Sequence, residues 1–292
     1  MEGAMNRWVL GARVRTLPAA VVPVALGASV GVGEGGARWW TVPVSGVVSL
    51  ALQVGVNYAN DYSDGVRGTD DVRVGPPRLV ASGLAPAAAV KRAALLAFGV
   101  AAACGLVLAA ATSWWLIAVG ALSVAAAWGY TGGPKPYGYL GLGEVFVFVF
   151  FGLVATVGTT YVVLERVPAV AWVLGCSAGS LACSLLVINN LRDIPTDRAV
   201  GKRTLAVRLG DLATRRAYVA LIAAAFVLLG IDAVLGRPLA LIGVAAAVLA
   251  VPPIRRVLGG AAGRDLISVL GMTGRVQLGF GALVTLGVAL SG

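Results

Sequence analysis

The sequence predicts an all-α integral membrane protein, and three features of its composition support this fold class. Hydrophobic residues make up 59% of the 292 residues and charged residues only 12%, and the mean hydropathy is +0.89. A soluble domain needs a more polar surface than this. The 40 glycines and the long Ala, Val and Leu runs favour closely packed helices. The alternating segments of roughly ten residues that mark a membrane β-barrel are not found.

Nine apolar runs are long enough to cross about 30 Å of hydrocarbon when tilt is allowed for. No linker or low-complexity segment separates them, so we interpret 1–292 as a single transmembrane domain. Similar sequences end the second and the sixth run, which indicates two related halves facing one central cavity. The nine predicted transmembrane helices lie near 17–33, 43–63, 90–111, 113–131, 141–163, 168–191, 214–232, 237–257 and 267–290.

The distribution of basic residues predicts the orientation of the chain. Nineteen of the 23 Lys and Arg residues fall on the side of the N-terminus, three fall on the other side, and Arg275 lies within the ninth run. Because basic loops stay in the cytoplasm, we predict a multi-pass protein of the cell (inner) membrane with a cytoplasmic N-terminus. The long loops after the second and sixth helices, 64–89 and 192–213, are then cytoplasmic, and the active site is expected to face the cytoplasm.

The same distribution accounts for the net charge of +10 by topology, so we expect the lipid bilayer and no nucleic acid as a partner. The chain contains no histidine, which excludes histidine-ligated metals and imidazole catalysis. The three cysteines lie in apolar runs without metal-ligand spacing, and we interpret them as core residues.

An acidic motif ends the second predicted helix, in the run NYANDYSDGVRGTDDVR. Helical spacing places Asn57, Asp61 and Asp64 on one face. Carboxylates that gather at a membrane boundary need a compensating cation or a water-filled opening. Magnesium suits such a site, because it binds a few carboxylates and completes its shell with water and phosphate oxygens. Asp70 is a further possible ligand, and a solvated acidic helix end is the alternative interpretation.

A second motif, NNLRDIPTDR, ends the sixth predicted helix and places Asp193 and Asp197 one turn apart. Helix capping and ordinary loop charge are the alternative for this motif alone. Two asparagine-led acidic motifs on one side of the membrane instead favour a pair of magnesium ions holding a diphosphate. The residues expected to bind that diphosphate are Asn57, Asn60, Arg67, Arg78, Lys135, Asn189, Asn190, Lys202 and Arg203.

Charged and aromatic residues inside the apolar runs are further candidates. Glu144 lies in the fifth run, and Arg275 and Gln277 lie in the ninth; a mutual Glu144–Arg275 ion pair is the alternative to a functional role. The fifth run also carries four phenylalanines. Their rings either pack in the core or stabilise an allylic cation without offering a nucleophile.

At these residues the chain resembles the UbiA superfamily of intramembrane prenyltransferases, and within it the bacterial 1,4-dihydroxy-2-naphthoate polyprenyltransferases of menaquinone synthesis. The resemblance covers nearly the whole length. It is carried by the stretches ARVRTLPAAVVPV, NDYSDGVRGTDDVRVGPPRLVASGL, GLGEVFVFVFFG, NNLRDIPTDRAVGKRTLAVRLG and GRVQLGFG.

The resemblance implies a Mg²⁺-dependent enzyme that transfers a polyprenyl group from polyprenyl diphosphate to 1,4-dihydroxy-2-naphthoate, with decarboxylation, giving demethylmenaquinone. The expected catalytic residues are Asp61, Asp64, Lys135, Asp193 and Asp197, and the four aspartates are the expected metal ligands. Many relatives carry another acid where this chain has Gly68. The candidates for contact with the aromatic acid are Arg13, Glu144, Phe148, Arg275 and Gln277.

Three other functions fit parts of the pattern. Another UbiA-type aromatic prenyltransferase would share every motif. Asp61 to Gly65 also matches the start of the CDP-alcohol phosphotransferase motif, although Val66 to Thr69 departs from its continuation. A cation-coupled transporter would use paired acids, but its site is expected near the bilayer midplane. The isoprenoid length and the oligomeric state are left open by the sequence.

Overall fold

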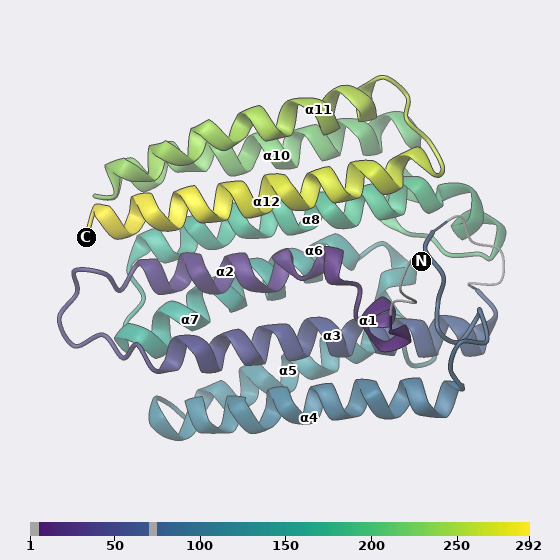
Figure 1. Ribbon diagram of the computed structural model, residues 1–292, viewed down its shortest axis with the longest axis horizontal. Helices are drawn as coiled ribbons and strands as arrows, with labels where there is room; N and C mark the ends of the chain where they lie inside the picture. The colour runs from purple at the N-terminus through teal and green to yellow at the C-terminus, as the bar shows by residue number, and fades with distance from the viewer. Residues whose placement is uncertain (1–5, 70–74) are drawn as a thin grey trace.

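The computed structural model describes residues 6–69 and 75–292, and this part of the chain is helical without strands (Figure 1). In chain order the elements are α1 (Arg7–Ala12), η1 (Val14–Thr16), α2 (Pro18–Ser29), α3 (Thr41–Arg67), α4 (Ala87–Ala111), α5 (Trp115–Gly129), η2 (Tyr137–Leu140), α6 (Gly143–Val147), η3 (Phe148–Val154), α7 (Ala155–Leu164), α8 (Ala169–Ala199), α9 (Leu205–Leu209), α10 (Asp211–Val234), η4 (Pro238–Ala246), α11 (Ala247–Leu258) and α12 (Asp265–Leu290).

Seven helical runs in the described residues are long and apolar enough to cross a membrane. They are α3, α4, α6 to α7, α8, α10, η4 to α11, and α12. An eighth is formed if Arg7–Thr16 and Pro18–Ser29, which are bent by 51° relative to each other, count as one span. The fourth predicted helix, 113–131, is α5, whose 15 residues are fewer than the roughly 20 that a crossing needs. A multi-pass helical membrane protein is therefore confirmed, whereas the count of nine crossings is not.

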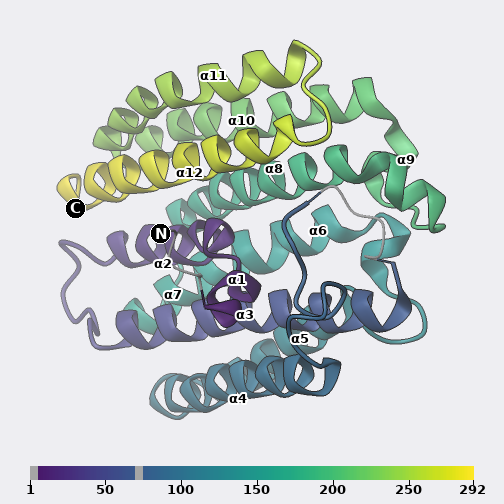
Figure 2. The ribbon, with the colours of Figure 1, turned by 45° about the vertical axis from the view of Figure 1, so that its right-hand side comes forward.

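The long helices lie side by side, with α4 and α5 at one edge of the bundle and α10 and α11 at the other (Figure 1). The view in Figure 2 keeps this order. Helix α8 occupies the middle, where it packs against α2, η3, α7, α10 and α12. The C-terminal ends of α3 and α8 carry the two acidic motifs at the same end of the bundle, which we call the motif end. The N-terminus lies there too, and the C-terminus lies at the opposite end.

Glycines allow η3 and α8 to approach closely. Gly175 and Gly179 are four residues apart on α8, the spacing that lets membrane helices pack backbone to backbone. A Cβ atom on Gly152 of η3 would come within 2.5 Å of the Gly179 Cα and 2.7 Å of the Gly175 carbonyl oxygen. Both are backbone atoms of a packed helix. The position therefore accepts only glycine without a shift of the helices.

We expect Gly152→Ala to destabilise the protein by about 1–3 kcal/mol, the usual effect of overpacking a core. Thermal unfolding in detergent measures the change. Gly99→Ala on α4 is the matched control, because its added methyl group would meet no atom within 4 Å. Equal melting temperatures for the two variants would contradict the proposed close contact.

Aromatic and charged residues mark the end of the bundle opposite the motif end. Five tryptophans there are 47–80% exposed, as side chains at a membrane–water interface are; they are Trp39, Trp40, Trp114, Trp115 and Trp172. All three basic residues predicted for this side form ion pairs: Arg38 with Glu165 at 3.1 Å, Arg237 with Glu34 at 3.5 Å, and Arg166 with Glu34. These pairs connect the loops at this end.

Candidate active site

One large cavity, of about 620 Å³, runs along the bundle. Asp64 and Ser45 both line it and are nineteen residues apart on α3, which at about 1.5 Å per residue separates them by about 28 Å. Its walls come mainly from α2, α3, α5, η3, α7 and α8 and from the loops at the motif end. The cavity therefore extends over most of the thickness of a bilayer.

Polar and charged side chains line the motif end of this cavity. Among the described residues the lining contains three acids and five basic residues, so that the walls carry an excess of positive charge suited to an anion. The acids are Asp64, Asp193 and Asp197; the basic residues are Arg13, Arg15, Arg78, Arg192 and Lys202; and the amides are Asn57, Asn60, Asn189 and Asn190, together with Gln53. Both predicted motifs thus meet in one place.

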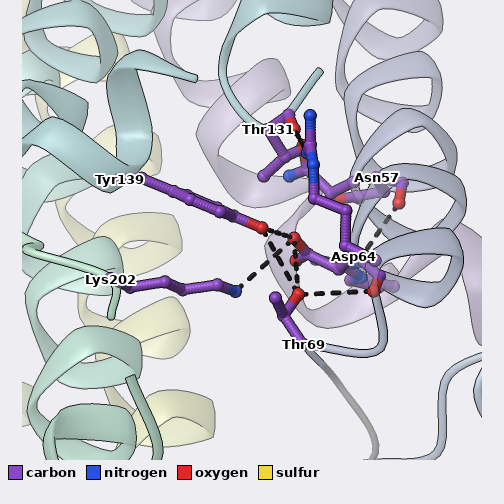
Figure 3. A network of polar contacts seen from close by, with 9 residues as sticks. Asn57, Asp64, Thr69, Thr131, Tyr139 and Lys202 are labelled. Carbon is purple, nitrogen blue, oxygen red and sulfur yellow. Dashed lines mark hydrogen bonds and ion pairs between the residues drawn. The ribbon is translucent and has the colours of Figure 1, made fainter. Parts of the chain in front are cut away.

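Asp64 is the centre of the hydrogen-bond network shown in Figure 3. Its Oδ1 accepts from the Tyr139 hydroxyl and, at 3.3 Å, from the Thr69 hydroxyl, and Lys202 Nζ lies 3.4 Å away. The same ammonium group lies 4.6 Å from the centre of the Tyr139 ring. Burial and then the Asp64 carboxylate raise the pKa of Tyr139, so its hydroxyl stays protonated and donates to Asp64.

The asparagines of the first motif are held by neighbouring elements. Asn60 Oδ1 accepts from the Thr131 hydroxyl at 2.8 Å. Asn57 Nδ2 donates to the Ala12 carbonyl oxygen at 2.9 Å and to Thr16 Oγ1 at 3.1 Å. These bonds join the N-terminal segment and the loop after α5 to α3. They fix the face of α3 that looks into the cavity.

The second motif contains an ion pair between sequence neighbours. Arg192 donates from Nε and Nη2 to the two carboxylate oxygens of Asp193, at 2.7 Å each, and its side chain is buried. A paired geometry of this kind holds both groups in place. One turn before Asp193, Asn189 donates to the Leu185 carbonyl oxygen. Asn190 instead donates to Glu144 Oε1 at 2.9 Å and so links α8 to α6.

Asp61 does not line the cavity. Its side chain is 1% exposed, and its two oxygens accept the backbone N–H groups of Leu79, at 2.8 Å, and Val80, at 3.0 Å. One of the metal ligands predicted in the first motif is therefore directed at a loop. Asp64, the other predicted ligand and one helical turn further on, does line the cavity.

Three of the predicted diphosphate-binding cations also lie outside the cavity lining. Arg67 donates to the carbonyl oxygens of Thr131 and Gly133 and so holds the loop after α5. Lys135 and Arg203 are exposed on the surface of the motif end. Asp70 lies outside the described residues.

Four of the five residues expected to contact the aromatic acid do not line the cavity. Glu144 bonds to Asn190 and forms no ion pair with Arg275, which is exposed. Gln277 is fully buried and does not reach the cavity. The Phe148 ring packs against Gly179 of α8. Arg13 does line the cavity, in a left-handed backbone conformation with φ of 53°, and donates to the Asn57 carbonyl oxygen at 3.1 Å.

Aromatic rings follow the charged region along one wall. The rings of Tyr137 and Phe146 stack with their centres 3.9 Å apart, and Phe150 follows at 6.1 Å from Phe146. All three residues line the cavity. Beyond them the walls are Val, Leu, Ala and Gly with a few hydroxyl groups. The cavity thus changes from charged to aromatic to aliphatic along its length.

The donor set at the motif end fits magnesium. Carboxylate and amide oxygens are the ligands that this ion takes. No cluster of three or more His, Cys, Asp or Glu side chains in the described chain could hold a metal alone. Asp64 stands on α3, whereas Asp193 and Asp197 stand on α8. An ion bound by either group would keep open positions for water and for phosphate oxygens, as magnesium sites commonly do.

Sequence reasoning missed two residues of this site. Arg192 lies inside the second motif and was assigned only to membrane topology, although its position between Asn190 and Asp193 was a usable signal. Tyr139 lies in the same Gly- and Pro-rich loop as Lys135, which the sequence favours as a diphosphate-binding residue because of its charge and this loop. No pattern distinguished this tyrosine from Tyr137.

The chain matches the model of the UbiA prenyltransferase family over residues 20–269. It is 52% identical to a protein of Mycobacterium tuberculosis named 1,4-dihydroxy-2-naphthoate octaprenyltransferase, over 93% of each chain. An Escherichia coli protein of the same name is 35% identical over 77% of this chain and 75% of its own length.

Solved structures share the fold at low sequence identity. The apo structure of a UbiA homologue from Aeropyrum pernix K1 gives a TM-score of 0.71 at 15% identity, covering 92% of this chain and 97% of that one. A homologue from Archaeoglobus fulgidus bound to GPP and Mg²⁺ gives 0.64 at 12% identity, covering 96% and 99%. With the family model and the sequence relatives, this likeness shows that the chain belongs to the UbiA prenyltransferase family.

Proposed function

We propose that this protein transfers a polyprenyl group from polyprenyl diphosphate to 1,4-dihydroxy-2-naphthoate, with loss of carbon dioxide, giving demethylmenaquinol, the reduced form of demethylmenaquinone, for menaquinone synthesis. The observation that carries the proposal is the large cavity, whose charged end suits a diphosphate and whose apolar length suits an isoprenoid. The names of the sequence relatives support the choice of acceptor. The acids gather at one end of the bundle, which argues against a transporter site at mid-depth.

The charged end would bind the diphosphate group. Asp64 and Asp197, with Asp193, Asn60 and Asn189, would hold magnesium, which when bound neutralises charge on the diphosphate. Three of the basic lining residues add hydrogen-bond donors that, unlike a metal ion, are a permanent part of the protein; they are Arg78, Arg192 and Lys202. Charges fixed in advance around the leaving diphosphate favour cleavage of its bond to the allylic carbon.

The aromatic wall lies next to the place where the allylic cation would form. Ring faces of Tyr137, Phe146 and Phe150 would stabilise its positive charge. The electron-rich naphthoate ring attacks this carbon, and the apolar walls exclude water that would otherwise react with it. Arg13 is the lining residue that we assign to the acceptor carboxylate.

The motif end would face the cytoplasm, where the basic loops place it. Counting the bent N-terminal pair and α5 as crossings gives the nine-helix arrangement that the sequence predicted. A tilt of the neighbouring helices and local thinning of the bilayer would allow the short α5 to cross.

The test is a product assay with the purified protein, magnesium, octaprenyl diphosphate and candidate aromatic acids, read by mass spectrometry. The expected product is the octaprenylated naphthoquinol without its carboxyl group. A prenylated product that keeps the carboxyl group, or transfer to 4-hydroxybenzoate in preference, would overturn the choice of reaction. Addition of EDTA is expected to stop the transfer, and restored magnesium to recover it.

A further inference from the structure

The segment 76–85, which we call the strap, crosses the motif end between α3 and α4. Its first residues, Pro76, Pro77 and Arg78, line the cavity. The next residue, Leu79, is fully buried, and internal turn bonds such as Ala85 N–H to the Leu79 carbonyl oxygen shape the rest. The place of Arg78 in the cavity wall therefore depends on how Leu79 and Val80 are held.

Asp61 holds these two residues. Each of its carboxylate oxygens accepts one backbone N–H, from Leu79 at 2.8 Å and from Val80 at 3.0 Å, in a region closed to solvent. A buried carboxylate is stable only when such donors replace its lost water. Charge-assisted bonds of this kind are about twice as strong as neutral ones.

Two close contacts fit the strap to the surface beneath it. A Cβ atom on Gly65, one turn after Asp61, would come within 2.6 Å of the Val80 side chain. The Leu79 side chain fills the space that the missing side chain of Gly11 leaves, with a hypothetical Cβ there only 2.6 Å from it. The strap thus contacts α1 and α3 through residues that leave room for it.

Tertiary contacts, rather than helical spacing, keep Asp61 out of the cavity. Asn57, Asn60 and Asp64 follow the spacing i, i+3, i+7 on α3, and all three line the cavity. Asp61 is rotated by about 100° from Asn60 but only about 40° from Asn57, so its bonds to Leu79 and Val80 are what direct its side chain to the strap. Asn57, Asn60 and Asp64 of α3 thus line the cavity, whereas Asp61 beside them binds the strap.

We infer that Asp61 is a positioning residue, which fixes the strap and with it Arg78 at the motif end of the cavity and does not itself bind metal. The inference rests on the proposed function for what Arg78 contacts, namely the diphosphate. The anchoring of the strap is independent of any substrate.

Asp61→Asn tests this, because asparagine keeps the shape but offers an acceptor to only one of the two N–H groups. Without substrate, we expect amide hydrogen exchange in residues 76–85 to become about tenfold faster, since one charge-assisted bond is lost and the other weakened. With substrates, KM for octaprenyl diphosphate should rise about tenfold while kcat stays within about threefold of wild type. The magnesium concentration for half-maximal rate should stay unchanged.

Three comparison variants make the readouts specific. Asp64→Asn should raise the magnesium concentration needed for half-maximal rate and lower kcat. Amide hydrogen exchange in the strap should stay as in wild type. Asp232→Asn, at another fully buried carboxylate that lies on α10 outside the cavity lining, should change none of these quantities. Gly65→Ala displaces Val80 without touching Asp61, so it should reproduce the rise in KM and answers the question if Asp61→Asn does not fold.

A shift of magnesium dependence in Asp61→Asn equal to that in Asp64→Asn, with strap exchange unchanged, would overturn the inference by making Asp61 a ligand. Unchanged strap exchange and unchanged KM would overturn it as well. Failure of the proposed function is a separate result, because the wild-type protein would then show no prenyl transfer. The hydrogen-exchange experiment needs no substrate and would still test whether Asp61 holds the strap.

Discussion

Asp64→Asn is expected to lower kcat/KM by about 100- to 1,000-fold, the size of effect seen when one charged or dipolar group at a reacting centre is removed. Asp64 is the acid of the first motif that lines the cavity, and it faces Lys202, Tyr139 and Thr69. Asparagine keeps the length and one acceptor oxygen, so the hydrogen bond from Tyr139 can persist. The lost quantity is the negative charge that would hold magnesium beside the diphosphate.

The loss should be measured in purified protein as a function of magnesium. If Asp64 binds the ion, the half-saturating magnesium concentration rises and part of the rate returns at high concentration. Asp232→Asn is the control for placing an amide at a buried carboxylate, and it should keep the wild-type rate. Wild-type kinetics in Asp64→Asn would remove this residue from the catalytic site.

The two acidic motifs show how far the sequence could predict the site. Their asparagine-led pattern and their shared side of the membrane predicted that α3 and α8 meet at one end, and the structure brings Asp64 within reach of Lys202 from the second loop. The spacing on α3 did not identify the correct stripe. Asn57, Asp61 and Asp64 satisfy helical spacing as well as Asn57, Asn60 and Asp64 do, and only tertiary contacts distinguish the two.

The basic residues expected to bind the diphosphate show the other limit of the sequence prediction, because charge and loop composition are the only signals that select them. Lys135 and Arg203 are basic residues of the right loops, yet both point to the surface, while Arg192 and Tyr139 of the same regions face the site. Composition and position in a loop carry no information on the direction in which a side chain points. Similarly, the apolar runs located the membrane helices, but the run 113–131 could not show that α5 would have only 15 residues.

The apolar half of the cavity suggests what determines the length of isoprenoid that fits. Gly120 of α5 and Gly158 of α7 both line it, and a Cβ at either would meet no atom within 4 Å, so each faces open space. Both lie in the half of the bundle away from Asp64 and Lys202. An added side chain at these positions would therefore enter the space for the tail without touching the charged end.

Gly158→Phe is accordingly expected to discriminate between isoprenoid diphosphates by length. A long substrate must displace the new ring or bend around it, and overpacking costs of about 1–3 kcal/mol correspond to a fall in kcat/KM on the order of 10- to 100-fold. Geranyl diphosphate ends before this region and should react within about threefold of the wild-type rate. Competition between geranyl and octaprenyl diphosphate in one reaction measures the ratio directly. Gly99→Phe on α4, an open position outside the lining, controls for a bulky ring on a membrane helix. An equal loss with both substrates would mean that the tail takes another path, because a ring that blocks only the apolar end leaves the diphosphate end unchanged.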